Sequence, residues 1–182
     1  MKKYILAIVT VLTLTQNTFS QTNSNIEAAL EDITGFELLL RTEEQLITDI
    51  EKSTAEIKNN IGSYKKIVKN GAMATSSVGF REIFLKEKDV QLITLNNTNV
   101  GGGQQRVEYY YAYGQLIYVE QTKTDFDVVS KKSIEKFYVN NGHLVAWFNS
   151  DNKLIDTSSA DFKALDSELD AYAMSLKKES LK

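Results

Sequence analysis

Few residues in this 182-residue chain have the types and spacing that catalysis requires. The single histidine, His143, directly follows an Asn-Gly pair. A metal site would need acidic partners for its imidazole, and a nucleophilic triad would need an aligned serine and acid. Neither pattern surrounds His143. We therefore interpret it as a polar residue beside a hairpin turn, and we predict no catalytic residue.

Acidic pairs are common in a chain with 24 aspartates and glutamates. Asp125 with Asp127, and Asp151 with Asp156, are candidate calcium ligands, but neither pair has the glycine and terminal glutamate of an EF-hand loop. The three glycines at 101–103 lack the lysine of a phosphate-binding loop. We predict no metal ion and no cofactor. A small hydrolase that uses an unlocated pair of carboxylates is the alternative.

Aromatic residues are the most distinctive feature of the chain. Tyr109, Tyr111 and Tyr113 alternate along one predicted strand, so their side chains should share one face. Five more aromatic residues fall on neighbouring predicted strands: Tyr118, Phe137, Tyr138, Trp147 and Phe148. Tyrosine combines apolar area with a hydroxyl group, which suits recognition of a protein, peptide or glycan. Because tyrosine also favours half-buried strands, packing in the core is the competing interpretation.

A helical segment is predicted over residues 24–70. Ser24 with Glu27, and Thr42 with Gln45, have the spacing of a capping box. Apolar residues then recur at three- and four-residue steps and line one helix face: Leu46, Ile50, Ile57, Ile61, Tyr64 and Val68. Such a stripe packs on its own domain or pairs with a second helix in a coiled coil.

The apolar period changes to that of strands at about residue 78, which predicts a sheet over residues 78–156. Three hairpins are expected, formed by 78–85 with 90–96, 106–113 with 115–122, and 133–140 with 143–149. Asn141-Gly142 is the strongest turn signal among them. They predict an antiparallel meander of about six strands, to which residues 153–156 could add a short seventh.

Cover on both faces of this sheet is expected, because residues 116–119 and 144–148 are apolar at successive positions. Ser158 or Ser159 is a suitable N-cap for a second helix over residues 160–178. The predicted fold class is α+β: an N-terminal helical segment, the β-meander and a C-terminal helix. Residues 21–182 should form a single domain.

The last two predicted hairpins are similar in sequence. Glu108-Tyr-Tyr-Tyr111 before Gly114 parallels Glu135-Lys-Phe-Tyr138 before Gly142, with one extra turn residue, and the first hairpin fits this pattern only loosely. Internal repetition and shared hairpin physics both explain this similarity. On these motifs and Ser63-Tyr-Lys-Lys66, the chain resembles an uncharacterised family of exported bacterial envelope proteins, with a long N-terminal helix and repeated E-x-x-Y-F-x-N-G-K-L-I hairpins. The resemblance implies a fold and a location, and no activity.

The first twenty residues have the pattern of a cleavable signal peptide. Lys2 and Lys3 precede an apolar run over 4–14, and Thr18-Phe19-Ser20 precedes Gln21. We predict cleavage between Ser20 and Gln21, with a retained N-terminal anchor as the alternative. The apolar run is about half the length of a membrane span, so the mature chain should have no transmembrane segment. The protein is therefore expected in the periplasm or outside the cell.

Composition narrows the expected function further. The formal net charge is −3, and removal of the two N-terminal lysines makes the mature chain more acidic, which argues against nucleic acid as a partner. The chain has no cysteine, which excludes thiol catalysis and thiolate metal sites. We expect a non-catalytic exported protein that binds an envelope or secreted protein, a peptide or a glycan. The aromatic sheet face or a helix would form the binding surface.

Overall fold

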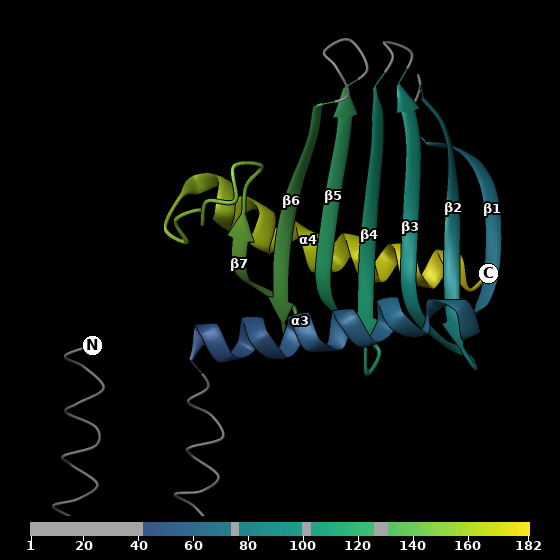
Figure 1. Cartoon of the computed structure of the whole chain (residues 1–182), viewed down its shortest axis with the longest axis horizontal. Coiled ribbons are helices and arrows are strands. Elements are labelled where there is room, and N and C mark those ends of the chain that lie inside the picture. The colour runs from purple at the N-terminus through teal and green to yellow at the C-terminus, as the bar shows by residue number, and fades with distance from the viewer. Residues whose placement is uncertain (1–41, 74–76, 100–102, 126–130) are drawn as a thin grey trace, which may run out of the picture. The chain divides into compact units, whose positions relative to one another are not determined.

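The computed structural model describes residues 42–73, 77–99, 103–125 and 131–182. In the unit Thr42–Lys182 a helix comes first, an antiparallel sheet of seven strands follows, and a second helix ends the chain (Figure 1). This arrangement confirms the predicted α+β class. The predicted signal peptide at 1–20 and the capping pair Ser24 and Glu27 lie outside the described residues.

Helix α3 spans Glu43–Asn60 and begins at the second predicted capping box. The Gln45 N–H donates to Thr42 Oγ1 at 3.2 Å, and the Thr42 N–H donates to the Gln45 side chain at 3.0 Å. A short 3-10 helix, Ile61–Ser63, follows directly. The predicted continuation of the helix to residue 70 is wrong, because strand β1 occupies Lys65–Met73.

Strand β1 shows why the apolar stripe was misleading. Tyr64 and Val68 continue the helical spacing of α3, but Val68 is 53% exposed. Its neighbour Ile67 packs into the core on the opposite face of the sheet, as alternation along a strand requires. Gly62 weakens the helix at this point, and all nine residues of β1 pair with β2. Pairing in the sheet therefore outweighs a local pattern that is compatible with either structure.

Six further strands follow, each antiparallel to the strand before it. They are β2 (Ser77–Lys86), β3 (Asp89–Asn99), β4 (Gln104–Ala112), β5 (Gln115–Asp125), β6 (Lys131–Asn140) and β7 (His143–Phe148). The sheet has seven strands rather than about six, and the additional strand is β1. The short strand predicted at 153–156 is reduced to an isolated bridge between Phe148 and Leu154.

Helix α4 spans Ala160–Ser180, close to the predicted 160–178. Ser159 is its N-cap, because the Phe162 N–H donates to Ser159 Oγ at 3.2 Å. Lys177 and Lys178 lie in its last turn, where the helix dipole favours positive charge. Helices α3 and α4 cross opposite faces of the sheet (Figure 1).

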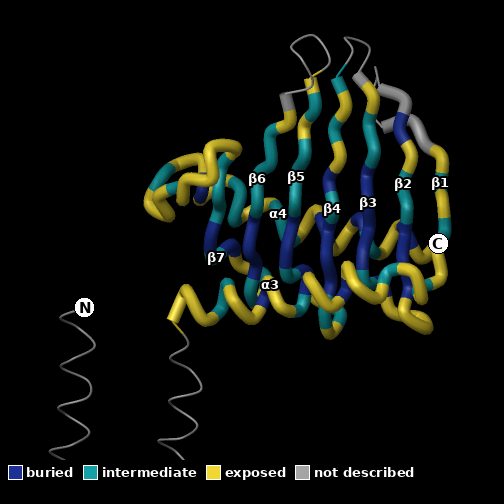
Figure 2. The backbone as a smooth tube through the Cα atoms, viewed as in Figure 1, coloured by how far each residue is buried: buried dark blue, intermediate teal, exposed yellow. Residues whose placement is uncertain are grey.

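Each face of the sheet therefore has its own core. Leu116 and Val119 belong to the core under α4, whereas Tyr118 belongs to the core under α3 and Ile117 packs against it. The predicted cover on both faces is thus found on β5. Buried residues gather in the strand halves that the helices cross, and the far ends of β3–β6 are more exposed (Figure 2).

Each of the three hairpins has a β-bulge at the same distance from its turn. The strand register shifts between residues 84 and 85, 110 and 111, and 138 and 139. A two-residue turn follows each shift, and its first residue has a positive φ: Glu87 at 58°, Tyr113 at 52° and Asn141 at 51°. The two-residue loops and recurrent bulges make the hairpins geometric copies, including the first.

This geometry corrects the sequence alignment of the copies. Tyr110 and Tyr138 occupy equivalent bulge positions, together with Phe84, whereas the sequence comparison matched Tyr111 with Tyr138. No extra turn residue separates the last two hairpins. A bulge places one extra, unpaired residue in one of the two strands, and in β5 this residue is Ile117. The alternation of side chains is interrupted there, so Ile117 and Tyr118 both face α3.

Candidate binding site

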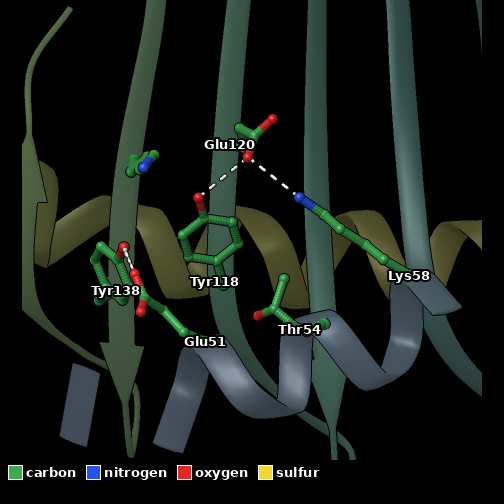
Figure 3. Close-up of a pocket in the computed structure, with 8 residues that line it drawn as sticks. Glu51, Thr54, Lys58, Tyr118, Glu120 and Tyr138 are labelled. Carbon is green, nitrogen blue, oxygen red and sulfur yellow. Dashed lines mark hydrogen bonds and ion pairs between the residues drawn. The ribbon is translucent and has the colours of Figure 1, made fainter. Parts of the chain in front are cut away.

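A groove of about 200 Å³ lies between α3 and the sheet. Its lining comes from α3, β5 and β6: Glu51, Thr54, Ala55, Lys58, Tyr118, Glu120, Lys136 and Tyr138. Glu51, Thr54, Ala55 and Lys58 follow the spacing i, i+3, i+4 and i+7, so they share one face of α3. Figure 3 shows the side chains of Glu51 and Lys58 directed from α3 toward Tyr138 and Glu120 of the sheet.

The predicted tyrosines are not part of this groove. Tyr109 and Tyr111 are 6% and 0% exposed and lie in the core under α4. The Tyr111 hydroxyl donates to the Ala173 carbonyl at 2.8 Å, and the rings of Tyr109 and Tyr172 are 6.0 Å apart. Burial raises the pKa of both buried hydroxyls. Their positions favour the packing interpretation for these two residues.

Tyr113 does not share a face with the other two. Strand β4 ends at Ala112, and Tyr113 begins the turn to β5 with its side chain fully exposed. The expected alternation over three residues fails because the chain leaves the strand one residue earlier than predicted. The structure therefore does not bring Tyr109, Tyr111 and Tyr113 together as one surface.

A second set of tyrosines lies on the α3 face. The sequence indicated Tyr118 and Tyr138 only as aromatic neighbours on adjacent strands, and it did not single out Tyr110. The ring of Tyr118 lies 5.6 Å from that of Tyr110 and 5.1 Å from that of Tyr138, measured between centroids. The three residues come from the adjacent strands β4, β5 and β6 and form an aromatic row under α3. The bulge in each hairpin sets which tyrosines enter this row, and no sequence signal marks it.

Two of these tyrosines donate to carboxylates that line the groove (Figure 3). The Tyr118 hydroxyl donates to Glu120 Oε2 at 3.2 Å, and the Tyr138 hydroxyl donates to Glu51 Oε1 at 2.8 Å. Burial, and then the adjacent carboxylates, raise the pKa of both phenols above their ordinary range. The phenols therefore stay protonated and act as fixed donors that orient the two carboxylates.

Lys58 closes one side of the groove. Its ammonium lies 3.3 Å from Glu120 Oε2 and 5.2 Å from the centre of the Tyr110 ring. Tyr118 is the second ring beneath it, at 6.0 Å. A cation over aromatic faces is attracted by their electron density, so these contacts hold Lys58 over the row. Its charge is balanced within the site by Glu120.

Two polar groups of the groove have no hydrogen-bond or ion-pair partner within the described part of the chain. Thr54 is 5% exposed, and its Oγ1 is buried without a hydrogen bond within the described part of the chain. Lys136 forms neither a hydrogen bond nor an ion pair with the described residues, although Glu120 lies opposite it on β5. Buried hydroxyl groups are normally hydrogen-bonded, so Thr54 is an exception among the residues that line the groove.

The other residues considered for chemistry have local roles. His143 Nδ1 lies 3.7 Å from Asp166, and the Leu144 N–H donates to the same carboxylate at 2.6 Å. Asp156 accepts the Ser158 N–H at 2.8 Å, which lowers the pKa of its carboxyl. Asp127 falls outside the described residues. No group of three or more metal-binding side chains occurs among the residues described.

Among the described residues, neither helix is both long enough and apolar enough to span a membrane. Comparison with protein-family models, curated proteins and solved structures found no match. The groove is therefore the feature of this protein that bears on its function.

Proposed function

We propose that this protein is an exported, non-catalytic binding protein that holds a polar part of its partner in the groove between α3 and the aromatic row. The observation that carries the proposal is Thr54, a residue that lines the groove and whose buried hydroxyl has no hydrogen bond within the described residues. Leaving such a group unpaired costs about 1–3 kcal/mol, and a bound ligand would recover part of this. The partner could be a protein, a peptide or a glycan, as expected from the sequence.

The chemistry of the groove suits binding better than catalysis. Thr54 has no general base in hydrogen-bond contact among the described residues, so nothing activates it as a nucleophile. Both carboxylates already accept a phenol hydroxyl. A rigid set of oriented donors and acceptors of this kind provides specificity in ligand sites.

A comparison of two threonines on α3 tests the site. Thr54→Val removes the unpaired hydroxyl and nearly preserves the shape, while Thr48→Val changes an exposed hydroxyl that bonds only to the Glu44 carbonyl among the described residues. A thermal-shift screen of small polar compounds should find ligands that raise the melting temperature of the parent protein and of Thr48→Val. The same ligands should have little effect on Thr54→Val. Equal stabilisation of all three proteins would contradict the proposal.

The hydrolase alternative has one specific observation in its favour, because Glu51 and Glu120 line the same groove. Paired carboxylates serve as acid and nucleophile or base in glycoside hydrolysis. Turnover of chromogenic glycosides by the parent protein, lost in both Glu51→Gln and Glu120→Gln, would establish this alternative. We expect no turnover.

We also propose that residues 1–20 direct export and are removed. Cell fractionation should place the protein in the periplasm or the medium, and N-terminal sequencing of the recovered protein should begin at Gln21. Recovery from the cytoplasm with Met1 intact would contradict this part of the proposal.

A further inference from the structure

Of the four charged side chains that line the groove, two form an ion pair with each other and two form none within the described residues. Glu120 and Lys58 form an ion pair at 3.3 Å, and Tyr118 adds a hydrogen bond to the same carboxylate oxygen. Glu51 accepts only the Tyr138 hydroxyl at 2.8 Å and has no ion pair within the described residues. Lys136 has no such partner among them either. The groove therefore contains one carboxylate and one ammonium group that no ion pair within the described residues neutralises.

The two unbalanced charges sit at neighbouring positions. Lys136 and Tyr138 are two residues apart on β6, so their side chains share one face and their Cα atoms are separated by roughly 7 Å. Glu51 is held at the Tyr138 hydroxyl. The Glu51 carboxylate is thus fixed beside Tyr138, and the ammonium group belongs to Lys136, two residues earlier on β6. A small molecule that carries a negative and a positive charge close together can therefore contact both groups.

We infer that the groove binds an amino-acid zwitterion, with its carboxylate on Lys136, its ammonium on Glu51 and a hydrogen bond from or to Thr54. The inference rests on the proposed binding groove and assigns it a small-molecule ligand, in place of part of a protein, a peptide or a glycan. A ligand of one sign would balance only one of the two charges, whereas a zwitterion balances both. The volume of about 200 Å³ is below that of pockets for drug-sized ligands, roughly 300–1,000 Å³, and suits a molecule of this size.

Three forms of one amino acid test the charge requirement. Isothermal titration of the purified protein would use L-leucine, L-leucine amide, which lacks the carboxylate, and N-acetyl-L-leucine, which lacks the ammonium. We expect L-leucine to bind at least about tenfold more tightly than either derivative, because each derivative loses one charge-assisted hydrogen bond. L-Alanine and its two derivatives, titrated in parallel, control for side-chain size.

Substitutions assign each charge to its end of the ligand. Lys136→Met should weaken L-leucine binding about tenfold and leave L-leucine amide unchanged, while Glu51→Gln should weaken L-leucine and leave N-acetyl-L-leucine unchanged. Glu51→Gln keeps an acceptor for Tyr138, so the fold should be preserved. Lys132→Met on the same strand and Glu56→Gln on the same helix are matched controls that should not alter binding, since neither residue lines the groove.

The outcomes separate this inference from the proposed function. If N-acetyl-L-leucine or L-leucine amide binds as tightly as L-leucine, the site recognises a single charge and the zwitterion inference is wrong, while the groove remains a binding site. If neither zwitterion binds, but another compound from the threonine screen requires Thr54, the inference also fails alone. If neither zwitterion binds and no compound distinguishes Thr54→Val from Thr48→Val, both fail.

Discussion

The two faces of the sheet use the same residue type in different ways. On the α4 face, the Tyr111 hydroxyl donates to a helix carbonyl, and Lys177 of α4 donates to the Gly114 carbonyl at 2.7 Å. On the α3 face, the hydroxyls of Tyr118 and Tyr138 donate to charged carboxylates at the edge of an open groove. Tyrosine thus closes a core on one side and positions ionised groups on the other. The difference comes from the two carboxylates on the α3 face, Glu51 on the helix and Glu120 on β5.

Alkaline pH should have the largest effect, and it should act on both faces. Five buried tyrosines have a pKa raised mainly by burial: Tyr109, Tyr110, Tyr111, Tyr118 and Tyr138. They stay protonated in the folded protein and ionise near pH 10 when it unfolds, so stability is complete below pH 10 and falls as the pH rises. The five groups together should lose at most about 5 kcal/mol between pH 10 and pH 11, because solvent screening reduces the contribution of the less deeply buried phenols, such as that of Tyr138. Urea unfolding at a series of pH values measures this slope.

Single Tyr→Phe variants measure how much each face of the sheet contributes to the fall of the unfolding free energy with pH. Tyr111→Phe and Tyr118→Phe should each reduce it by about one fifth, because each removes one proton-binding group. A reduction at only one of the two positions would show that the faces differ in the burial of their phenols, contrary to the structure.

Truncation of a buried tyrosine should have the next largest effect. Tyr111→Ala removes a fully buried ring under α4 and should lower the free energy of unfolding by about 3–5 kcal/mol. Tyr113→Ala, two residues along, should change it by less than about 0.5 kcal/mol because the side chain is exposed. Chemical denaturation checks both. Similar losses at the two positions would mean that Tyr113 is packed in solution.

Removing a buried hydroxyl that has no partner should raise stability. Thr94 is 0% exposed on β3, and its Oγ1 has no hydrogen bond within the described residues. Thr94→Val nearly preserves its shape, so we expect a gain of about 1 kcal/mol in the free energy of unfolding. Because Thr94 does not line the groove, ligand binding should be unchanged, in contrast to Thr54→Val. Destabilisation would show that this hydroxyl has a partner in solution, such as water.

The smallest effects should come from the two lysines that cross from the helices to the sheet. Lys177→Met loses a partly buried hydrogen bond to Gly114 and should cost about 1 kcal/mol. Lys58→Met loses an ion pair whose lysine is 43% exposed, so solvent screening should limit its cost to about 0.5 kcal/mol. Thermal and urea unfolding compare the two. A larger loss at Lys58 would indicate that its contacts with the tyrosine rings dominate.

The elements that depend on local chemistry could be predicted from the sequence. The Thr42–Gln45 capping box, the Ser159 N-cap and the Asn141-Gly142 turn occur where their side chains and backbone preferences place them. Strand β1 could not be predicted in this way, because its apolar spacing fits a helix and only pairing with β2 distinguishes the two.

The candidate site illustrates the same limit. Glu51, Thr54 and Lys58 have helical spacing that is visible in the sequence, but their sheet partners Glu120, Lys136 and Tyr138 are more than 60 residues away. Which tyrosines face α3 depends on a β-bulge in each hairpin, and a bulge has no consistent residue signature here. The sequence therefore identified an aromatic sheet without indicating its polar side.

By itself, the sequence determined the α+β class, the order of the hairpins and the cover on both faces, because these follow from apolar periodicity, caps and turns over short stretches of chain. The tertiary structure decided the extent of α3, the seventh strand, the division of the tyrosines between two cores and the groove under α3. These features arise from contacts between distant segments. The energy of such contacts depends on register and burial, which exist only once the sheet has formed.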